Sequence, residues 1–316
     1  MRKLFTSIFF LCAVHGYGQQ ALQFSQYLFN GVVINPAYAG SREAININGL
    51  FRKQWVKVNG EPTSVTFSGD MPVYYDRIGI GAYFIHDELG AQFQNSFFGS
   101  FAYRIKVSTR GRLALGIATG VTGYGIDGNK LTTDQPYDPA VPVGRETRTR
   151  PAFQGGLYFN TDRFFIGLSL NNMVVNLKND NDFDLVPYQR KHLFLATGFV
   201  SQIADKVKIR PSLMLKEDLR GPTNGDFSAF FIFNDIVWIG ASYRSRIYNK
   251  STVEDAGTAK DAVVLMAEIF PIPNLRLGYS YDITITSYRD FATHEISAGY
   301  NINRKSGSKM LTPRYF

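Results

Sequence analysis

The stretch 275-LRLGYSYDIT-284 alternates large apolar side chains with small, polar or charged ones. The apolar set is Leu275, Leu277, Tyr279, Tyr281 and Ile283, and the other set is Arg276, Gly278, Ser280, Asp282 and Thr284. A period of two residues is that of a β-strand, in which successive side chains point to opposite faces. The stretch therefore predicts a strand that separates an apolar environment from a polar one.

Similar segments follow one another from residue 43 onward. We count about fourteen, and an even number of antiparallel strands suits a closed bacterial barrel. They begin near residues 44, 63, 78, 94, 112, 151, 164, 192, 207, 225, 236, 261, 275 and 293. Aromatic residues make up 15% of the chain and glycine occurs 29 times, which favours strands over helices. The alternation by itself also fits a soluble β-sandwich.

The lengths of the connections distinguish a barrel from a sandwich. Short connections at 71–77, 106–111, 161–163, 202–206, 234–235 and 271–274 alternate with others that include the long stretches 125–150, 172–191 and 245–260. Short turns on one side and long loops on the other are typical of outer-membrane barrels, whose short turns face the periplasm. We therefore expect an all-β fold class, a transmembrane outer-membrane β-barrel of about fourteen antiparallel strands across residues 43–303.

The two ends of the chain do not follow the alternation. A basic start, a short apolar stretch and a small-x-small site ending at Gly18 are typical of a secretory signal peptide, which we assign to residues 1–18. Residues 19–42 should form either a plug in the barrel lumen or a periplasmic segment. Residues 304–316 follow the last alternating segment and contain a proline, so we expect a periplasmic C-terminal tail.

Aromatic residues are concentrated in the segment that precedes the first strand. Such side chains are costly to expose to water, and disordered segments are usually poor in them. Proline at position 36 and glycine at position 40 allow the peptide to fold back toward the barrel. We expect contacts with the lumen wall or with a periplasmic partner, and the candidates are Phe24, Tyr27, Phe29, Asn35, Pro36 and Tyr38.

Charged residues of both signs occupy the small, polar face of the predicted strands. Opposite charges that project into a barrel can form a network that fills the lumen or lines a narrow pore. The candidates for this lumenal charge network are Arg52, Arg244, Arg276, Asp282 and Glu295, and Arg104, Arg210 and Glu268 share the same face. We favour a structural network over a conducting pore.

Motifs that could carry chemistry are better explained as loops. The glycine pattern at 123–128 matches a phosphate-binding string, but Thr132 and Pro136 stand where the following helix is needed, so we interpret it as a bend into a surface loop. The carboxylates of 179–184 are spaced as in calcium loops, but Leu185 stands at the glycine position. The histidines follow no catalytic or metal-binding spacing. We expect no enzyme activity, no cofactor and no metal site.

Charge and cysteine content exclude further classes. Cys12, the only cysteine, lies in the predicted signal peptide, so the mature chain has no thiol. Removal of Arg2 and Lys3 lowers the formal net charge from +8 to +6, and the remaining basic residues form no run. A modest charge without a basic patch gives no support for nucleic-acid binding. The expected surroundings of the barrel are outer-membrane lipids.

An ordered set of short strings resembles the PorP/SprF family of type IX secretion system membrane proteins. The strings are 24-FSQYLFN-30, 34-INPAYAGSR-42, 52-RKQW-55, Gly60-x-Pro62, 79-GIG-81, Asp87-x-x-Gly90, 210-RPS-212, Trp238-x-Gly240, Tyr243-Arg244, Tyr281-Asp282-x-Thr284, 294-HEIS-297 and 313-PRYF-316. They span nearly the whole mature chain. Each string alone is weak, but their common order is specific.

The resemblance implies an outer-membrane protein of a Gram-negative bacterium of the Bacteroidetes type, with roles in protein secretion and gliding motility. It implies export or anchoring of a secreted adhesin that carries a C-terminal sorting domain. It also implies contacts with periplasmic type IX machinery or peptidoglycan-linked lipoproteins. The Asn-Pro-Ala string at 35–37 resembles the hatch of fatty-acid transport barrels. The alternative is therefore a transport barrel for a hydrophobic or small polar solute.

Overall fold

The structure is a computed structural model of the chain, and it describes residues 24–74, 76–132, 141–174, 191–218, 222–248, 260–285 and 291–302. The predicted signal peptide, the calcium-like stretch 179–184 and the predicted tail 304–316 lie outside these residues. Strands dominate, and of the helices in the described residues none is long and apolar enough to span a bilayer.

The strands form one antiparallel sheet, which contains fifteen of them within the described residues. Their bounds are β1 (Ile45–Lys53), β2 (Thr63–Val73), β3 (Ile78–Leu89), β4 (Gln92–Lys106), β5 (Arg112–Asp127), β6 (Arg145–Asn160), β7 (Phe164–Val174), β8 (His192–Phe199), β9 (Ser201–Ala204), β10 (Val207–Glu217), β11 (Thr223–Phe233), β12 (Val237–Tyr248), β13 (Lys260–Ile272), β14 (Leu275–Thr284) and β15 (Thr293–Ile302). Because β8 and β9 are separated only by Val200 and both pair with β10, they form one interrupted strand. The described wall therefore has fourteen strands, as the sequence predicts.

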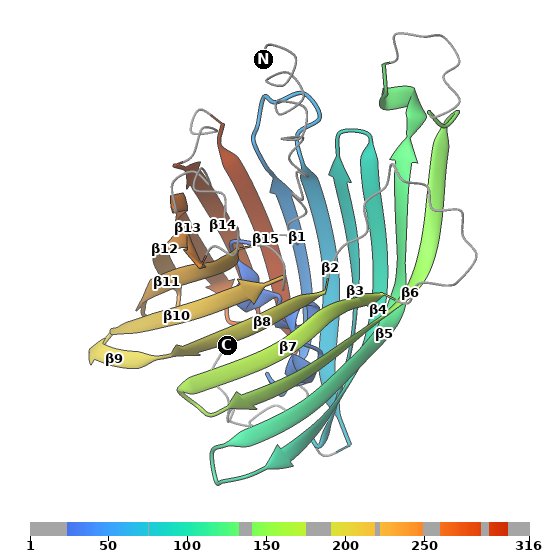
Figure 1. Cartoon of the computed structure of the whole chain (residues 1–316). Coiled ribbons are helices and arrows are strands. Elements are labelled where there is room, and N and C mark those ends of the chain that lie inside the picture. Colours follow the sequence, from blue (N-terminus) through green and yellow to red (C-terminus); the bar gives the residue numbers. More distant parts are fainter. Residues whose placement is uncertain are drawn as a thin grey trace, which may run out of the picture.

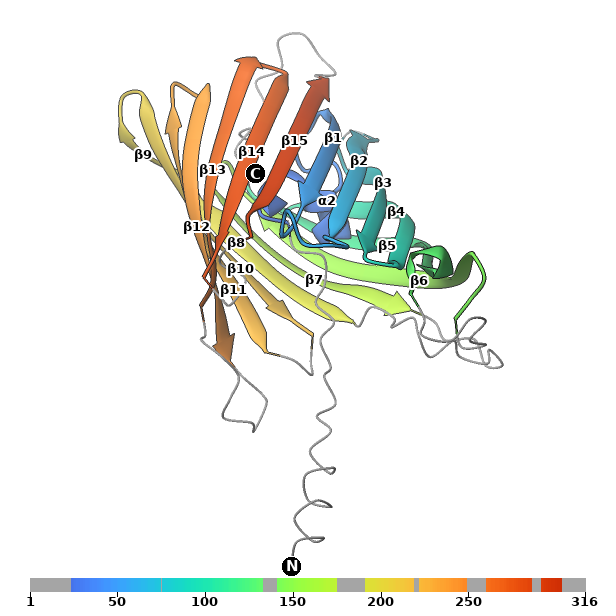
Figure 2. The same ribbon diagram turned by 90° about the horizontal axis from the view of Figure 1, so that it is seen from above.

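The sheet closes on itself. The first strand, β1, pairs with the last, β15, from Ile45 opposite Ile302 to Lys53 opposite His294. The chain of neighbours also closes between β10 and β11, so every strand of the described wall lies between two others. Figures 1 and 2 show the resulting ring from the side and from above. Closure satisfies the backbone hydrogen bonds of all strands, which a sheet in a lipid bilayer requires.

The two faces of the wall have opposite character. Large apolar side chains point outward and are exposed, among them Phe67 at 60% and Ile117 at 66%. The inward positions of β14 are Arg276, Gly278, Ser280 and Asp282, and all are buried. An apolar exterior around a polar interior is unfavourable in water but suits a bilayer. The two faces assigned from the alternation of 275–284 are thus confirmed.

Connections of different length gather at opposite ends of the barrel. The short ones join β2 to β3, β4 to β5, β6 to β7, β9 to β10, β11 to β12 and β13 to β14. The other end carries the long ones, and its two exceptions are the two-residue turn between β3 and β4 and the five-residue connection between β10 and β11. The first long loop is shorter than expected, because β5 and β6 stay paired up to Asp127 opposite Arg145. Our interpretation of 123–128 as a loop bend is therefore wrong, since 123–127 belong to β5 and η4 (Gly128–Lys130) follows.

Residues 24–42, which we call the lumenal segment, lie inside the ring of strands. They contain three short helical turns, η2 (Tyr27–Phe29), α2 (Gly31–Ile34) and η3 (Pro36–Tyr38). Figure 2 shows these turns surrounded by the wall. The hydrophobic core of the molecule consists of this segment and the inward side chains that face it. The interior of the barrel is therefore packed around a piece of the same chain.

Candidate functional site

The lumenal segment is buried along nearly its whole length. The solvent-exposed fraction is 5% or less for Phe24, Tyr27, Phe29 and Tyr38, and Asn35 and Pro36 are buried too. The structure thus places all six candidates of this segment against the lumen wall. Burial of one Phe side chain contributes roughly 1.5–3 kcal/mol. The aromatic residues therefore supply a substantial part of the free energy that holds the segment in place.

Asn35 links the fold of the segment to the wall. Its Oδ1 accepts a hydrogen bond from the backbone N–H of Ala37 at 2.9 Å, which caps η3, and Pro36 occupies the first position of that turn. Its Nδ2 donates to the carbonyl oxygens of Leu157 at 2.8 Å and Leu168 at 3.3 Å, on β6 and β7. One amide therefore fixes both the turn and its position on two strands.

Glycines allow the segment to approach the wall backbone. A Cβ atom at Gly116 of β5 would overlap the backbone of Ala37, and one at Gly156 of β6 would overlap the side chain of Asn35. The same is true of Gly79 against Ala39 and of Gly278 against Gln26. These four inward positions lack side chains where the segment lies closest. Composition alone indicated many glycines but not this role.

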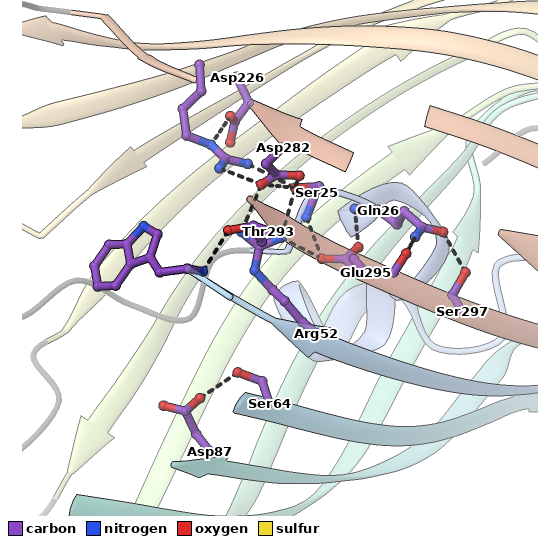
Figure 3. A network of polar contacts seen from close by, with 12 residues as sticks. Ser25, Gln26, Arg52, Ser64, Asp87, Asp226, Asp282, Thr293, Glu295 and Ser297 are labelled. Carbon is purple, nitrogen blue, oxygen red and sulfur yellow. Dashed lines mark hydrogen bonds and ion pairs between the residues drawn. The ribbon is translucent and has the colours of Figure 1, made fainter. Parts of the chain in front are cut away.

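The beginning of the segment binds the charged residues of three strands (Figure 3). The backbone N–H groups of Ser25 and Gln26 donate to the carboxylate of Glu295 at 3.0 and 2.7 Å. The Ser25 hydroxyl donates to Asp282 at 2.8 Å and accepts from Arg52 Nη1 at 3.0 Å. Arg52 also contacts Asp282 at 2.8 Å and Glu295 at 3.0 Å. The backbone of the segment, the Ser25 hydroxyl and the three charged side chains of the wall therefore form one network.

The network continues along the wall as a ladder of alternating charges. Arg244 of β12 lies 3.4 Å from Asp282 and donates to Asp226 of β11 at 2.6 Å. Lys216 of β10 lies 3.4 Å from the other oxygen of Asp226. The ladder therefore runs Lys216, Asp226, Arg244, Asp282, Arg52, Glu295, and its charges balance. Removing one member of such a buried network leaves an uncompensated charge, which is strongly destabilising.

Phe29 contacts two guanidinium groups. The ring centroid of Phe29 lies 4.8 Å from Cζ of Arg210 and 4.3 Å from Cζ of Arg276. The ring also packs on Trp238 with a centroid separation of 5.8 Å. Glu268 lies 3.8 Å from Arg276 and contributes the nearby negative charge. Cation–π contacts are strongest when both partners are removed from water, as they are here.

The end of the segment is fixed by one polar contact with β2 and by one within the segment itself. Gly40, with φ +71°, donates its N–H to Asp70 of β2 at 2.8 Å, and Arg42 donates to the hydroxyl of Tyr38 at 2.8 Å. Burial raises the pKa of Tyr38 and raises that of Tyr27 to about 12. Both phenols are therefore neutral at physiological pH and act only through packing and hydrogen bonds.

The structure brings all five predicted lumenal charges into contact with the lumenal segment. Arg52, Asp282, Glu295 and Arg244 meet around Ser25, whereas Arg276 lies apart from them, beside Phe29. Sequence reasoning missed Ser25, Gln26, Asp70, Asp226 and Lys216. Asp70, Asp226 and Lys216 occupy the same alternate positions of their strands as the small polar residues that point inward. That alternation is the signal that could have identified them.

The site is equipped to hold a peptide. Its groups are carboxylates, guanidinium ions, amides and aromatic rings, and they are engaged with the lumenal segment or with one another. In the part of the chain that the structure describes, no group of His, Cys, Asp and Glu could hold a metal ion. The arrangement fixes a chain segment inside a barrel.

A closed antiparallel barrel with an apolar exterior and a charged interior defines the class of outer-membrane β-barrel proteins. The chain belongs to the PorP/SprF family, whose model, described as "Type IX secretion system membrane protein PorP/SprF", matches residues 16–300. The protein is thus an outer-membrane component of the type IX secretion system. No curated protein matches the chain.

Several solved structures of outer-membrane barrels are similar to this chain. The CymD monoaromatic hydrocarbon channel has a TM-score of 0.49 and 12% identity, with 93% of this chain and 97% of that chain covered. Omp33 of Acinetobacter baumannii has a TM-score of 0.48 and 9% identity, with 82% and 98% covered. A FadL homologue of Pseudomonas aeruginosa has a TM-score of 0.43 and 12% identity, with 82% and 89% covered.

Proposed function

We propose that the barrel helps to export a secreted adhesin, or anchors it at the cell surface, through protein–protein contacts. The observation that carries this proposal is the occupied lumen. Residues 24–42 are hydrogen-bonded or packed against β1, β2, β5, β6, β7, β14 and β15, which leaves little room for a solute path. A barrel filled by its own chain presents a rigid surface on both sides of the membrane.

In this proposal the lumenal segment is a plug. It is fixed at its start by the ladder of charges and at its end by Asp70 of β2. Contacts at both ends of a peptide restrict it more than a single attachment does, because each removes conformational freedom that the other leaves. The plug would stay in place while partners bind and leave.

The long loops face the outside and meet the adhesin, which carries a C-terminal sorting domain. The short turns face the periplasm and meet type IX machinery or peptidoglycan-linked lipoproteins. The difference in connection length between the two ends supports this orientation. In a gliding bacterium of the Bacteroidetes type, such a barrel would couple the adhesin outside to the machinery inside.

A transport role for a hydrophobic or small polar solute is the second candidate. Two cavities of about 50 and 40 Å³ flank the lumenal segment, and a solute could use them if the segment moved. Both are far smaller than the roughly 300–1,000 Å³ of ordinary ligand pockets. The filled lumen therefore favours anchoring.

Two measurements distinguish the anchoring role from the transport role. Purified full-length protein is inserted into planar bilayers, and the protein is also captured from native outer membranes. We expect no steady conductance and co-purification with a surface adhesin and periplasmic components. Steady conductance from the intact barrel, with no secreted protein captured, would support transport and contradict anchoring.

A further inference from the structure

The cavity of about 50 Å³ lies between the lumenal segment and the wall. Phe24 and Tyr27 of the segment line one side, and Phe98, Phe194 and Met214 of β4, β8 and β10 line the other. A cavity needs about 10–15 Å³ of such volume to hold one water molecule. This one is therefore several times larger than the minimum for one water molecule, which suits the end of a molecule rather than a whole one.

The cavity lies near the end of the barrel that carries the long connections. Gln94, Asn172 and Lys216 belong to its lining. They stand next to the start of β4, the end of β7 and the end of β10, all of which lie on the side of the long connections.

Two amide oxygens on the lining are left without a hydrogen bond. Asn171 Nδ2 donates to the carbonyl oxygens of Val33 at 3.4 Å and Ile34 at 2.8 Å. Because carbonyl groups only accept, the orientation of this amide is fixed, and its Oδ1 has no partner. Gln154 Nε2 bonds the hydroxyl of Tyr83 at 2.5 Å, and its Oε1 likewise has no partner. Both side chains are at least nine-tenths buried.

Lys216 provides a positive charge on the same lining. Its side chain is 7% exposed, and its Nζ lies 3.4 Å from Asp226. That carboxylate bonds Arg244 more closely, at 2.6 Å. An ammonium group can donate three hydrogen bonds, so Lys216 retains the capacity to bind a further acceptor. The lining thus combines one cationic donor, two unpaired amide acceptors and aromatic surface.

We propose that this cavity binds the carboxylate end of an N-acylated apolar amino acid, either free or as the last residue of a polypeptide. The carboxylate accepts hydrogen bonds from Lys216, and the amide N–H donates to Oδ1 of Asn171 or Oε1 of Gln154. The apolar side chain packs on Phe98 and Phe194. Unpaired buried acceptors are costly, and a ligand that supplies an N–H removes this cost. The inference goes beyond the proposed function, because such binding does not require a secreted partner.

Other ligand classes fit the lining less well. A simple fatty acid carries the carboxylate but no N–H for the two amide oxygens. A cationic ligand would be repelled by Lys216. A neutral amide could pair with Asn171 and Gln154, but its carbonyl oxygen is an uncharged acceptor and binds the ammonium group more weakly than a carboxylate does. The combination of carboxylate, N–H and apolar group is what the cavity distinguishes.

The test uses the purified full-length barrel in detergent micelles and isothermal titration calorimetry. The probes are N-acetyl-leucine, its neutral amide, and isocaproate, which lacks the N–H group. We expect N-acetyl-leucine to bind saturably and the other two to bind about tenfold or more weakly, as for the loss of one charge-assisted hydrogen bond. Equal binding of the acid and the amide, or no binding of the acid, overturns the proposal.

Variants locate the binding in this cavity. Lys216→Met should abolish the preference for the acid, and Met214→Trp, which fills the cavity, should weaken binding of every probe. Lys208→Met is the matched control, because Lys208 lies on the same strand and pairs with Asp235 outside the cavity. Unchanged binding by Lys216→Met and Met214→Trp also overturns the proposal. If either variant fails to fold, the comparison of acid and amide on the wild-type protein still decides.

One further arm separates the two sources of the ligand. A short peptide that ends in leucine is compared with N-acetyl-leucine, each with a free carboxylate. Binding of the peptide at equal or greater strength identifies a polypeptide end, and binding of N-acetyl-leucine alone identifies a free molecule. Both results support the class of ligand.

Discussion

Arg52 of β1 and Asp282 of β14 form an ion pair at 2.8 Å although β15 lies between their strands. Arg52 also bonds Glu295 of that intervening strand at 3.0 Å. The guanidinium group therefore ties three adjacent strands together at the point where the first and last strands of the barrel meet. The Ser25 hydroxyl lies in the same contact and is held by both Arg52 and Asp282.

Replacement of Arg52 tests this junction. Arg52→Met should lower the free energy of unfolding by about 3–5 kcal/mol, because it removes the ion-pair partner of Glu295 and leaves Asp282 with Arg244 alone. Lys53→Met is the matched control: its side chain is 41% exposed and pairs with Glu61, so we expect a loss of about 0–1 kcal/mol. Urea titrations of refolding into lipid vesicles measure both. Similar losses for the two variants would show that the buried network contributes little.

The glycines of the lumen wall give a second prediction. Gly156→Ala should destabilise the barrel by about 1–3 kcal/mol, as overpacking does, because the added methyl group meets Asn35. Gly155→Ala is the control, since a Cβ atom there meets nothing within 4 Å. Because the only cysteine of the sequence, Cys12, lies in the predicted signal peptide, Val33→Cys can report the position of the segment through its reaction with a water-soluble maleimide. The Val33→Cys variant should react slowly, and the double variant with Gly156→Ala should react faster. Equal rates for the two would contradict close packing of the segment against Gly156.

The outward face gives a third prediction. Leu277 is 43% exposed on the outside of β14, where we expect hydrocarbon. Leu277→Arg should cost roughly 2–4 kcal/mol near the middle of the membrane. Leu277→Met keeps the apolar character and should cost less than about 1.5 kcal/mol. Refolding titrations in vesicles distinguish the two, and equal stability of the Arg and Met variants would place Leu277 away from lipid.

Deletion of residues 24–38, with the signal peptide retained, tests the proposed plug. The truncated barrel loses the contacts of Ser25 and Phe29 and leaves Arg52 facing an empty lumen. We expect the truncated barrel to unfold at a lower temperature in a heat-modifiability assay, which follows the shift in electrophoretic mobility on heating. We also expect it to conduct ions in planar bilayers. Full-length protein is the control in both assays. A truncated barrel that is as stable as the full chain, equally silent and still bound to its partners would make the segment dispensable.

The orientation of the barrel gives the last prediction. Protease added to intact cells should cut within 125–150, 172–191 or 245–260, which we place outside. The turn at Asn234 and Asp235 should resist cleavage until the outer membrane is permeabilised, because short turns face the periplasm. Cleavage at that turn in intact cells would invert the topology. Immunoblots of an affinity tag at the C-terminus can follow the fragments.

The sequence predicted the wall of the barrel well because the signal for it is local. In 275–284 each residue alternates with its neighbour, so the strand and its two faces follow from ten consecutive residues. The inward placement of Asp282 follows from the same phase. The boundaries were less accurate: β6 begins at Arg145, not near 151, because its pairing with β5 continues beyond the apolar alternation.

The sequence by itself determined that the chain forms strands, which face of each is apolar, and that aromatic residues precede the first strand. The tertiary structure decided that those aromatics lie in the lumen, that Arg52 reaches Asp282 across β15, and that Gly116 and Gly156 make room for the segment. These relationships depend on closure and register, which bring together residues separated by up to 271 positions. A local period carries no information about such pairs, because many combinations of strands share the same alternation.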